Sequence, residues 1–154
     1  GDSLSHLERW TVNPATRSVN VQVIDESPNE FPRHRHDVGN QPYRFGYCAS
    51  PSNQPGKAWP TLKHDLKTGE RKVFDHGAGR AAGGPVFVAK ENSEAEDAGY
   101  LMTFVQDQGK DAAEFVVMDA EDFDRGYVAR VKLPQRIPFG FHGNWASDAS
   151  VPPD

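Results

Sequence analysis

Cysteine is almost missing from this sequence, as are several features that mark particular protein classes. Cys48 is the only cysteine among 154 residues, so no internal disulfide can form, and a reducing compartment such as the cytoplasm is expected. There is no run of 18 apolar residues, so no membrane-spanning helix is expected, and no signal peptide is seen. With no basic run and a formal net charge of −5, the chain gives no support to binding of nucleic acid or of anionic membranes.

Glycine and proline, in contrast, are plentiful, with 14 and 12 copies. Many turns and little long helix follow, which predicts an all-β protein in a chain of ordinary single-domain length. One helical turn is expected over 120–126. About ten strands are expected, the clearest at 7–12, 19–24, 43–49, 58–65, 70–75, 85–89, 100–106, 114–119 and 127–133.

Two features of these strands can be predicted in more detail. Val19, Val21 and Val23 alternate with polar residues, so the second strand is expected to be half-buried. The strands over 58–65 and 70–75 are expected to form a hairpin closed at Gly69, which can supply the positive φ that the turn needs.

The stretch 138–145, Pro-Phe-Gly-Phe-His-Gly-Asn-Trp, holds the most notable candidate for chemistry. As a strand it would place Phe139, Phe141 and Trp145 on one face and His142 on the other. Imidazole is the commonest protein ligand of transition metals, and the glycines beside His142 leave room for a ligand. The alternative is a hydrogen-bonded core histidine, because one histidine by itself makes no metal site.

Other candidate sites are weaker. His34 and His36 would share one face of a strand, as metal ligands can, but Arg33 and Arg35 would repel a cation, so a solvated charged loop is favoured. A zinc hydrolase built on these two histidines lacks a third ligand at suitable spacing. Three further predictions are exposure of His64 and His76 at strand ends, a solvated acidic loop over 91–97, and no phosphate-binding loop in the glycine-rich stretch 77–84.

Seven short motifs follow one another along nearly the whole chain. They are Leu7-x-Arg9-Trp10, Glu30-Phe31-Pro32-Arg33, Tyr43-Arg44-Phe45-Gly46-Tyr47, Leu62-x-x-Asp65-Leu66-x-Thr68-Gly69, Pro85-Val86-Phe87-Val88, Val117-Met118-Asp119-Ala120 and Pro138-Phe139-Gly140-Phe141-His142-Gly143. In order and spacing they resemble the C-terminal part of the carotenoid cleavage oxygenases, a family with apocarotenoid, lignostilbene and retinal-pigment-epithelium members.

The resemblance implies a seven-bladed β-propeller with a non-haem Fe(II) held on its axis by four histidines. Such enzymes use O2 to split a conjugated C=C bond of a carotenoid, apocarotenoid or stilbene into two carbonyl products. His142 matches the last iron ligand, which makes it the expected catalytic and metal-binding residue. Glu30 matches a glutamate that hydrogen-bonds a ligand imidazole and fixes its orientation. No ligand position is matched by His6, His34, His36, His64 or His76.

On this resemblance, residues 1–154 are the C-terminal portion of a single propeller domain, about three blades. The other three ligands and the N-terminal blades would lie outside the chain, which by itself is expected to be incomplete and inactive. The expected partners are O2, an apolar polyene or stilbene, and the N-terminal blades of the same propeller. Any peripheral membrane contact would come from the part outside this chain.

One position departs from the family pattern. Gly84, just before Pro85, replaces another glutamate that supports a ligand, and losses of this kind can cost ~10–100-fold in metal affinity or activity. A second functional class therefore stays open beside the iron dioxygenase. It is a metal-free, propeller-derived module that binds a protein partner or a lipid.

Overall fold

The computed structural model describes residues 5–140 and 142–151, and nearly all of its regular structure is β. The strands are β1 (Leu7–Asn13), β2 (Ser18–Asp25), β3 (Glu30–Arg33), β4 (Phe45–Ala49), β5 (Thr61–Asp65), β6 (Glu70–Phe74), β7 (Arg80–Ala82), β8 (Val86–Ala89), β9 (Gly99–Asp107), β10 (Ala112–Asp119) and β11 (Tyr127–Lys132). Two short 3-10 helices are η1 (His36–Val38) and η2 (Asp148–Ser150). The all-β prediction is confirmed. None of the helices in the described residues is long and apolar enough to cross a membrane.

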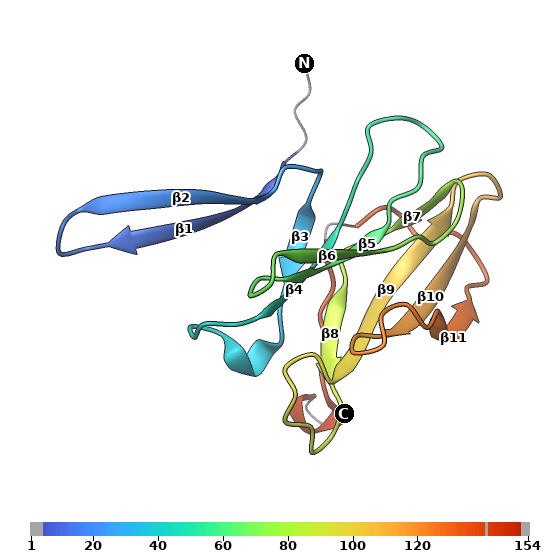
Figure 1. Cartoon of the computed structure of the whole chain (residues 1–154). Helices are drawn as coiled ribbons and strands as arrows, with labels where there is room; N and C mark the ends of the chain where they lie inside the picture. The colour runs from blue at the N-terminus through green and yellow to red at the C-terminus, as the bar shows by residue number, and fades with distance from the viewer. Residues whose placement is uncertain (1–4, 141, 152–154) are drawn as a thin grey trace.

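The strands form three antiparallel sheets (Figure 1). Strands β1 and β2 make a separate hairpin. The order in the four-stranded sheet is β3-β4-β5-β6, and in the five-stranded sheet it is β11-β10-β9-β7, with β8 also paired to β9. The turn between β5 and β6 has Gly69 at φ +77, as the turn chemistry predicts. Two strands, β3 and β7, were not predicted, and no helical turn forms over 120–126.

The β1–β2 hairpin projects away from the two larger sheets (Figure 1). Its register places Trp10 opposite Val21 and Val12 opposite Val19, so the apolar residues share one face, as the alternation predicts. The prediction that the strand is half-buried, with the valine face covered, is wrong, since Val19, Val21 and Val23 are 54%, 48% and 46% exposed. Alternation fixes which residues share a face, but burial needs a second layer, and the described residues place none over the hairpin.

The main core joins the four-stranded and five-stranded sheets. Tyr47 of β4 packs with Leu101 of β9, Met118 of β10 and Phe123 of the following turn. Tyr47 also stacks on the Phe87 ring of β8, with centroids 5.6 Å apart. Side chains from both sheets thus interdigitate in one apolar layer, which fixes the two sheets relative to each other.

Two histidines lie inside this part of the molecule, although the sequence predicts them at the surface. His64 is 3% exposed and His76 is 6% exposed. The His76 ring is within 2.9 Å of Thr61 Oγ1 and 2.8 Å of Tyr127 Oη, so it links the two larger sheets. A strand end is buried when another sheet packs over it, which local sequence does not encode.

The C-terminal segment, residues 133–147, contains no strand among its described residues. The strand considered for residues 138–145, with His142 on one of its faces, therefore does not form among the described residues. Phe139 and Trp145 are more than half exposed, and Phe141 lies outside the described residues. Pro134, Pro138 and the two glycines disfavour a continuous ladder here, and side-chain contacts place the segment instead.

Candidate functional site

The candidate site is built on β3, the edge strand of the four-stranded sheet. β3 pairs with β4 through Glu30 opposite Ala49 and Arg33 opposite Tyr47, and the register shifts between these pairs. Within the irregularity Phe31 has φ +55, a left-handed backbone conformation that is rare for a bulky residue. Such a bulge changes the direction of the side chains along an edge strand.

The C-terminal segment runs past this edge and contacts it at two neighbouring positions. The Phe31 ring lies 6.1 Å from the His142 imidazole, centroid to centroid. Arg33 Nη2 donates a hydrogen bond of 2.9 Å to the carbonyl oxygen of Gly143. Farther up the segment, the Phe139 ring lies 5.5 Å from that of Trp59. The fold thus brings together the two motifs that carry the predicted site residues, Glu30 and His142.

Buried polar groups hold the backbone just before Glu30. Asn29 is buried, and His64 Nε2 donates a 2.9 Å hydrogen bond to its side-chain oxygen. Burial lowers the pKa of His64, which favours the neutral imidazole in this contact. The backbone N–H of Asn29 donates to the carbonyl oxygen of Ser5 at 2.9 Å, and the Ser5 hydroxyl donates to Glu30 Oε1. Glu30 therefore starts β3 from a fixed position.

Gly84, where the resemblance leads one to expect a second supporting glutamate, lies on the connection between β7 and β8. It is half-buried and directly precedes the buried Pro85. A glycine offers no side-chain oxygen to accept a hydrogen bond from an imidazole.

His34 and His36 do not face a common site: His34 contacts an aromatic ring, and His36 is exposed. The His34 ring lies 4.7 Å from that of Tyr43, and His36 is exposed in η1. Between them, Arg35 donates 2.9 Å to Ala95 O and forms a 2.7 Å ion pair with Asp37. Within residues 5–140 and 142–151 there is no group of three or more His, Cys, Asp or Glu able to hold a metal ion. These contacts give a zinc site on His34 and His36 no support.

Cys48 is buried in β4 beside the candidate site. Its burial, with the nearby charges of Asp25 and Glu30, raises the pKa of the thiol to about 12. The thiol stays protonated at neutral pH and is a poor nucleophile. This surrounding gives thiol catalysis no support.

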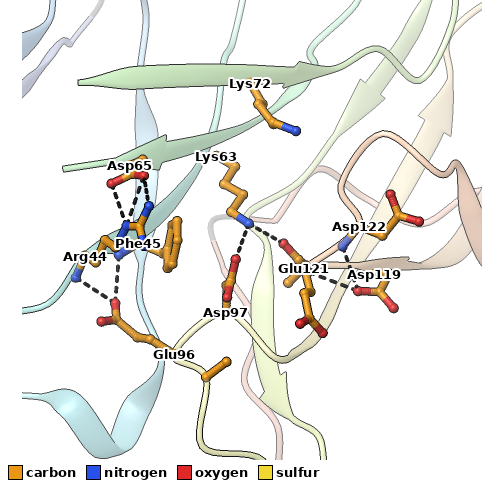
Figure 2. Close-up of polar contacts among 12 residues, drawn as sticks. Arg44, Phe45, Lys63, Asp65, Lys72, Glu96, Asp97, Asp119, Glu121 and Asp122 are labelled. Carbon is orange, nitrogen blue, oxygen red and sulfur yellow. Dashed lines mark hydrogen bonds and ion pairs between the residues drawn. The ribbon is translucent and has the colours of Figure 1, made fainter. Parts of the chain in front are cut away.

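A partly buried ion pair, which the sequence did not predict, fixes the loop between β8 and β9 (Figure 2). Lys63 Nζ donates 2.7 Å to Asp97 Oδ2 and 2.6 Å to Ala120 O, and lies 4.4 Å from the centre of the Phe45 ring. Next to it, Glu96 Oε1 accepts 2.7 Å hydrogen bonds from the backbone N–H groups of residues 44 and 45. No short-range pattern marks Lys63, because its partners come from another sheet.

A cavity of about 370 Å³ lies between the hairpin and β3. Its apolar lining includes Leu7, Trp10, Ile24 and Tyr43, and Arg33 also contributes to its wall. Glu30 and His142 are not among the lining residues, so this cavity is separate from the contact between β3 and the C-terminal segment.

Comparison with known proteins identifies relatives for nearly the whole chain. Residues 1–147 match the family model described as retinal pigment epithelial membrane protein. The carotenoid cleavage oxygenase of Mycobacterium tuberculosis is 36% identical over 152 residues, a match that covers 95% of this chain and 30% of the relative. The lignostilbene-alpha,beta-dioxygenase isozyme III of Sphingomonas paucimobilis is 30% identical and is covered to 33%.

A solved structure agrees with these matches. The cobalt-substituted apocarotenoid oxygenase of Synechocystis superposes with a TM-score of 0.86 at 31% identity, over 93% of this chain and 30% of that chain. The expected fold class, blades of a β-propeller, is thereby confirmed. The chain spans about a third of the length of the relatives it matches.

Proposed function

This chain belongs to the retinal pigment epithelial membrane protein family, which includes the carotenoid cleavage oxygenases, and from this premise we propose that it is the C-terminal part of a non-haem Fe(II) dioxygenase. The proposed reaction is cleavage of a conjugated C=C bond in a carotenoid, apocarotenoid or stilbene by O2, with two carbonyl products. The single observation that carries the proposal is the meeting of the Glu30–Arg33 strand with the His142–Gly143 segment at one sheet edge.

His142 suits the role of one iron ligand. Its side chain is exposed, so a ring nitrogen is accessible, and imidazole nitrogen is a suitable donor for Fe(II). A single imidazole cannot hold iron, and the remaining donors are proposed to come from parts of the propeller that these 154 residues do not cover. Bound iron would supply the means to activate O2.

Glu30 is proposed to orient a ligand imidazole rather than to bind iron. Its carboxylate has two oxygens, of which Oε1 accepts from Ser5, so Oε2 can accept an imidazole N–H. That hydrogen bond would select the ring tautomer whose other nitrogen faces the metal. The buried contact between Asn29 and His64 keeps Glu30 in register for this task.

The proposal can be tested in a chimera in which this chain replaces the matching third of the Synechocystis apocarotenoid oxygenase. We expect His142→Ala to abolish iron binding and O2-dependent aldehyde formation, with little change in thermal stability, because the exposed imidazole makes few protein contacts. Glu30→Ala should weaken iron binding by roughly 10–100-fold without abolishing it. The exposed His36 provides the matched control, and His36→Ala should keep full iron content.

A metal-free binding module is the second candidate, supported by Gly84 and by the exposed apolar face of the hairpin. The same experiment separates the two functions. Full iron and full activity in the His142→Ala chimera would refute the ligand role of His142. A chimera that folds but never binds iron, with His142 intact, would favour the binding module.

A further inference from the structure

Among the residues that the structure describes, few contacts hold His142 in place. The described part of the segment, 133–140 and 142–147, forms no strand, and a Cβ built on Gly140 or Gly143 meets no heavy atom within 4 Å. Close packing around the glycines therefore does not hold the segment. In the described residues, two contacts tie this part of the segment to β3: the Phe31 ring against His142, and Arg33 against the carbonyl oxygen of Gly143.

We propose that Arg33 is a positioning residue that holds His142 at the edge of β3 through its hydrogen bond to the Gly143 carbonyl. This inference rests on the proposed function, in which His142 is an iron ligand. Arg33 is itself well placed for the role, because its backbone pairs with Tyr47, whose side chain is fully buried in the core. Its guanidinium thus connects a rigid strand to the residue that directly follows His142.

The hydrogen bond from Arg33 is of a kind that can restrain the backbone next to His142. A hydrogen bond from a charged guanidinium to a carbonyl is stronger than one between neutral groups. It restrains the peptide unit next to His142, and the Phe31 ring then limits the imidazole on its other side. Metal sites need their ligands held within a fraction of an ångström, which a segment without ladder bonds does not provide alone.

The test uses the 154-residue chain with no metal and compares Arg33→Ala, Arg33→Lys and a control, Arg71→Ala. Arg71 lies on β6, the opposite edge of the same sheet, where it pairs with Asp25 at 3.1 Å. The first readout is the nuclear Overhauser contact between the Phe31 and His142 ring protons. The second is hydrogen exchange of the backbone amides over 142–147, compared with that of β4 and β5.

We expect Arg33→Ala to lower the population of the ring contact about fivefold and to speed exchange in 142–147 by a similar factor, with β4 and β5 unchanged. Arg33→Lys should restore part of the effect, because it keeps a cationic donor, and Arg71→Ala should leave the contact intact. An unchanged ring contact in Arg33→Ala would overturn the positioning role. So would equal acceleration in 142–147, β4 and β5, which indicates general destabilisation.

Iron measurements distinguish the positioning role of Arg33 from the ligand role of His142. In the chimera described above, the iron content of His142→Ala tests the ligand role whatever Arg33 does. If that role holds, Arg33→Ala should lower iron affinity by roughly 10–100-fold while leaving the unfolding temperature unchanged, and Arg33→Lys should recover part of it. Unchanged iron affinity in Arg33→Ala, with His142 still required, would refute the positioning role alone.

Discussion

Acidification should weaken the junction between the two larger sheets through His76. The ring is buried between Thr61 of β5 and Tyr127 of β11 and makes a polar contact with each. Burial, with a smaller effect of the positive charge on Arg80, lowers the pKa of His76 from 6.5 to about 4, while Asp75 acts weakly in the opposite direction. The folded protein therefore binds this proton less readily than the unfolded chain does.

The change in unfolding free energy with pH follows from the difference between the pKa of His76 in the folded and unfolded states. Because the folded pKa lies below the unfolded one, stability is lost as the pH falls from above 6.5 toward 4, and the loss from this group is complete below about 4. Between pH 7 and pH 5 the histidine alone should cost roughly 2 kcal/mol of unfolding free energy. Partial burial raises the pKa of Asp25, but hydrogen bonds from Ser27 and Arg71 outweigh it and lower the pKa to about 2, so this carboxylate does not titrate in that window.

The assay is urea unfolding followed by tryptophan fluorescence at pH 7 and pH 5. In His76→Gln, which cannot take up the proton, the difference between the two pH values should shrink by roughly 2 kcal/mol. The exposed His36 serves as control, and His36→Gln should keep the wild-type difference. The same pH difference in wild type and His76→Gln would refute the reasoning, since His76 would then not be the responsible group.

Three further predictions concern other parts of the fold. Gly99→Ala should lower the free energy of unfolding by about 2 kcal/mol or more, because the added Cβ overlaps the Phe87 ring and lies 2.6 Å from the carbonyl oxygen of Val88; thermal unfolding measures this loss, and wild-type stability would contradict the close approach. Lys63→Met should lower the free energy of unfolding by about 2 kcal/mol because it leaves the partly buried Asp97 without its cation, and adding Asp97→Asn should recover part of the loss; equal losses in the single and double variants would show that the charge is not the cause. The exposed apolar face of the hairpin should make the chain self-associate, and sedimentation should show less association for Val21→Thr, with no change if another surface is responsible.

Much of the fold could be predicted from local sequence. Alternating valines marked β2, the Gly69 turn marked the β5–β6 hairpin, and apolar runs marked β9 and β10. Each of these signals is short in range, because strand pleat and turn geometry depend on neighbouring residues. The ordered motifs also identified the family, since they record side-chain requirements at separate positions along the chain.

Tertiary structure decided what these elements contact. The valines of β2 share one face as predicted, yet they are exposed, because the described residues place no layer over the hairpin. His64 and His76 are buried for the opposite reason, since packing between sheets and loops covers strand ends that look polar in the sequence.

In the candidate site, too, the sequence predicted which residues matter, and the tertiary structure decided how they are placed. The motifs pointed to Glu30 and His142, but the strand expected around His142 does not form. The left-handed Phe31 and the Arg33 contact with Gly143 became visible only when the C-terminal segment was placed against β3. Residue identity sets which donors and rings are available, whereas contact between segments far apart in the chain depends on how the whole fold packs.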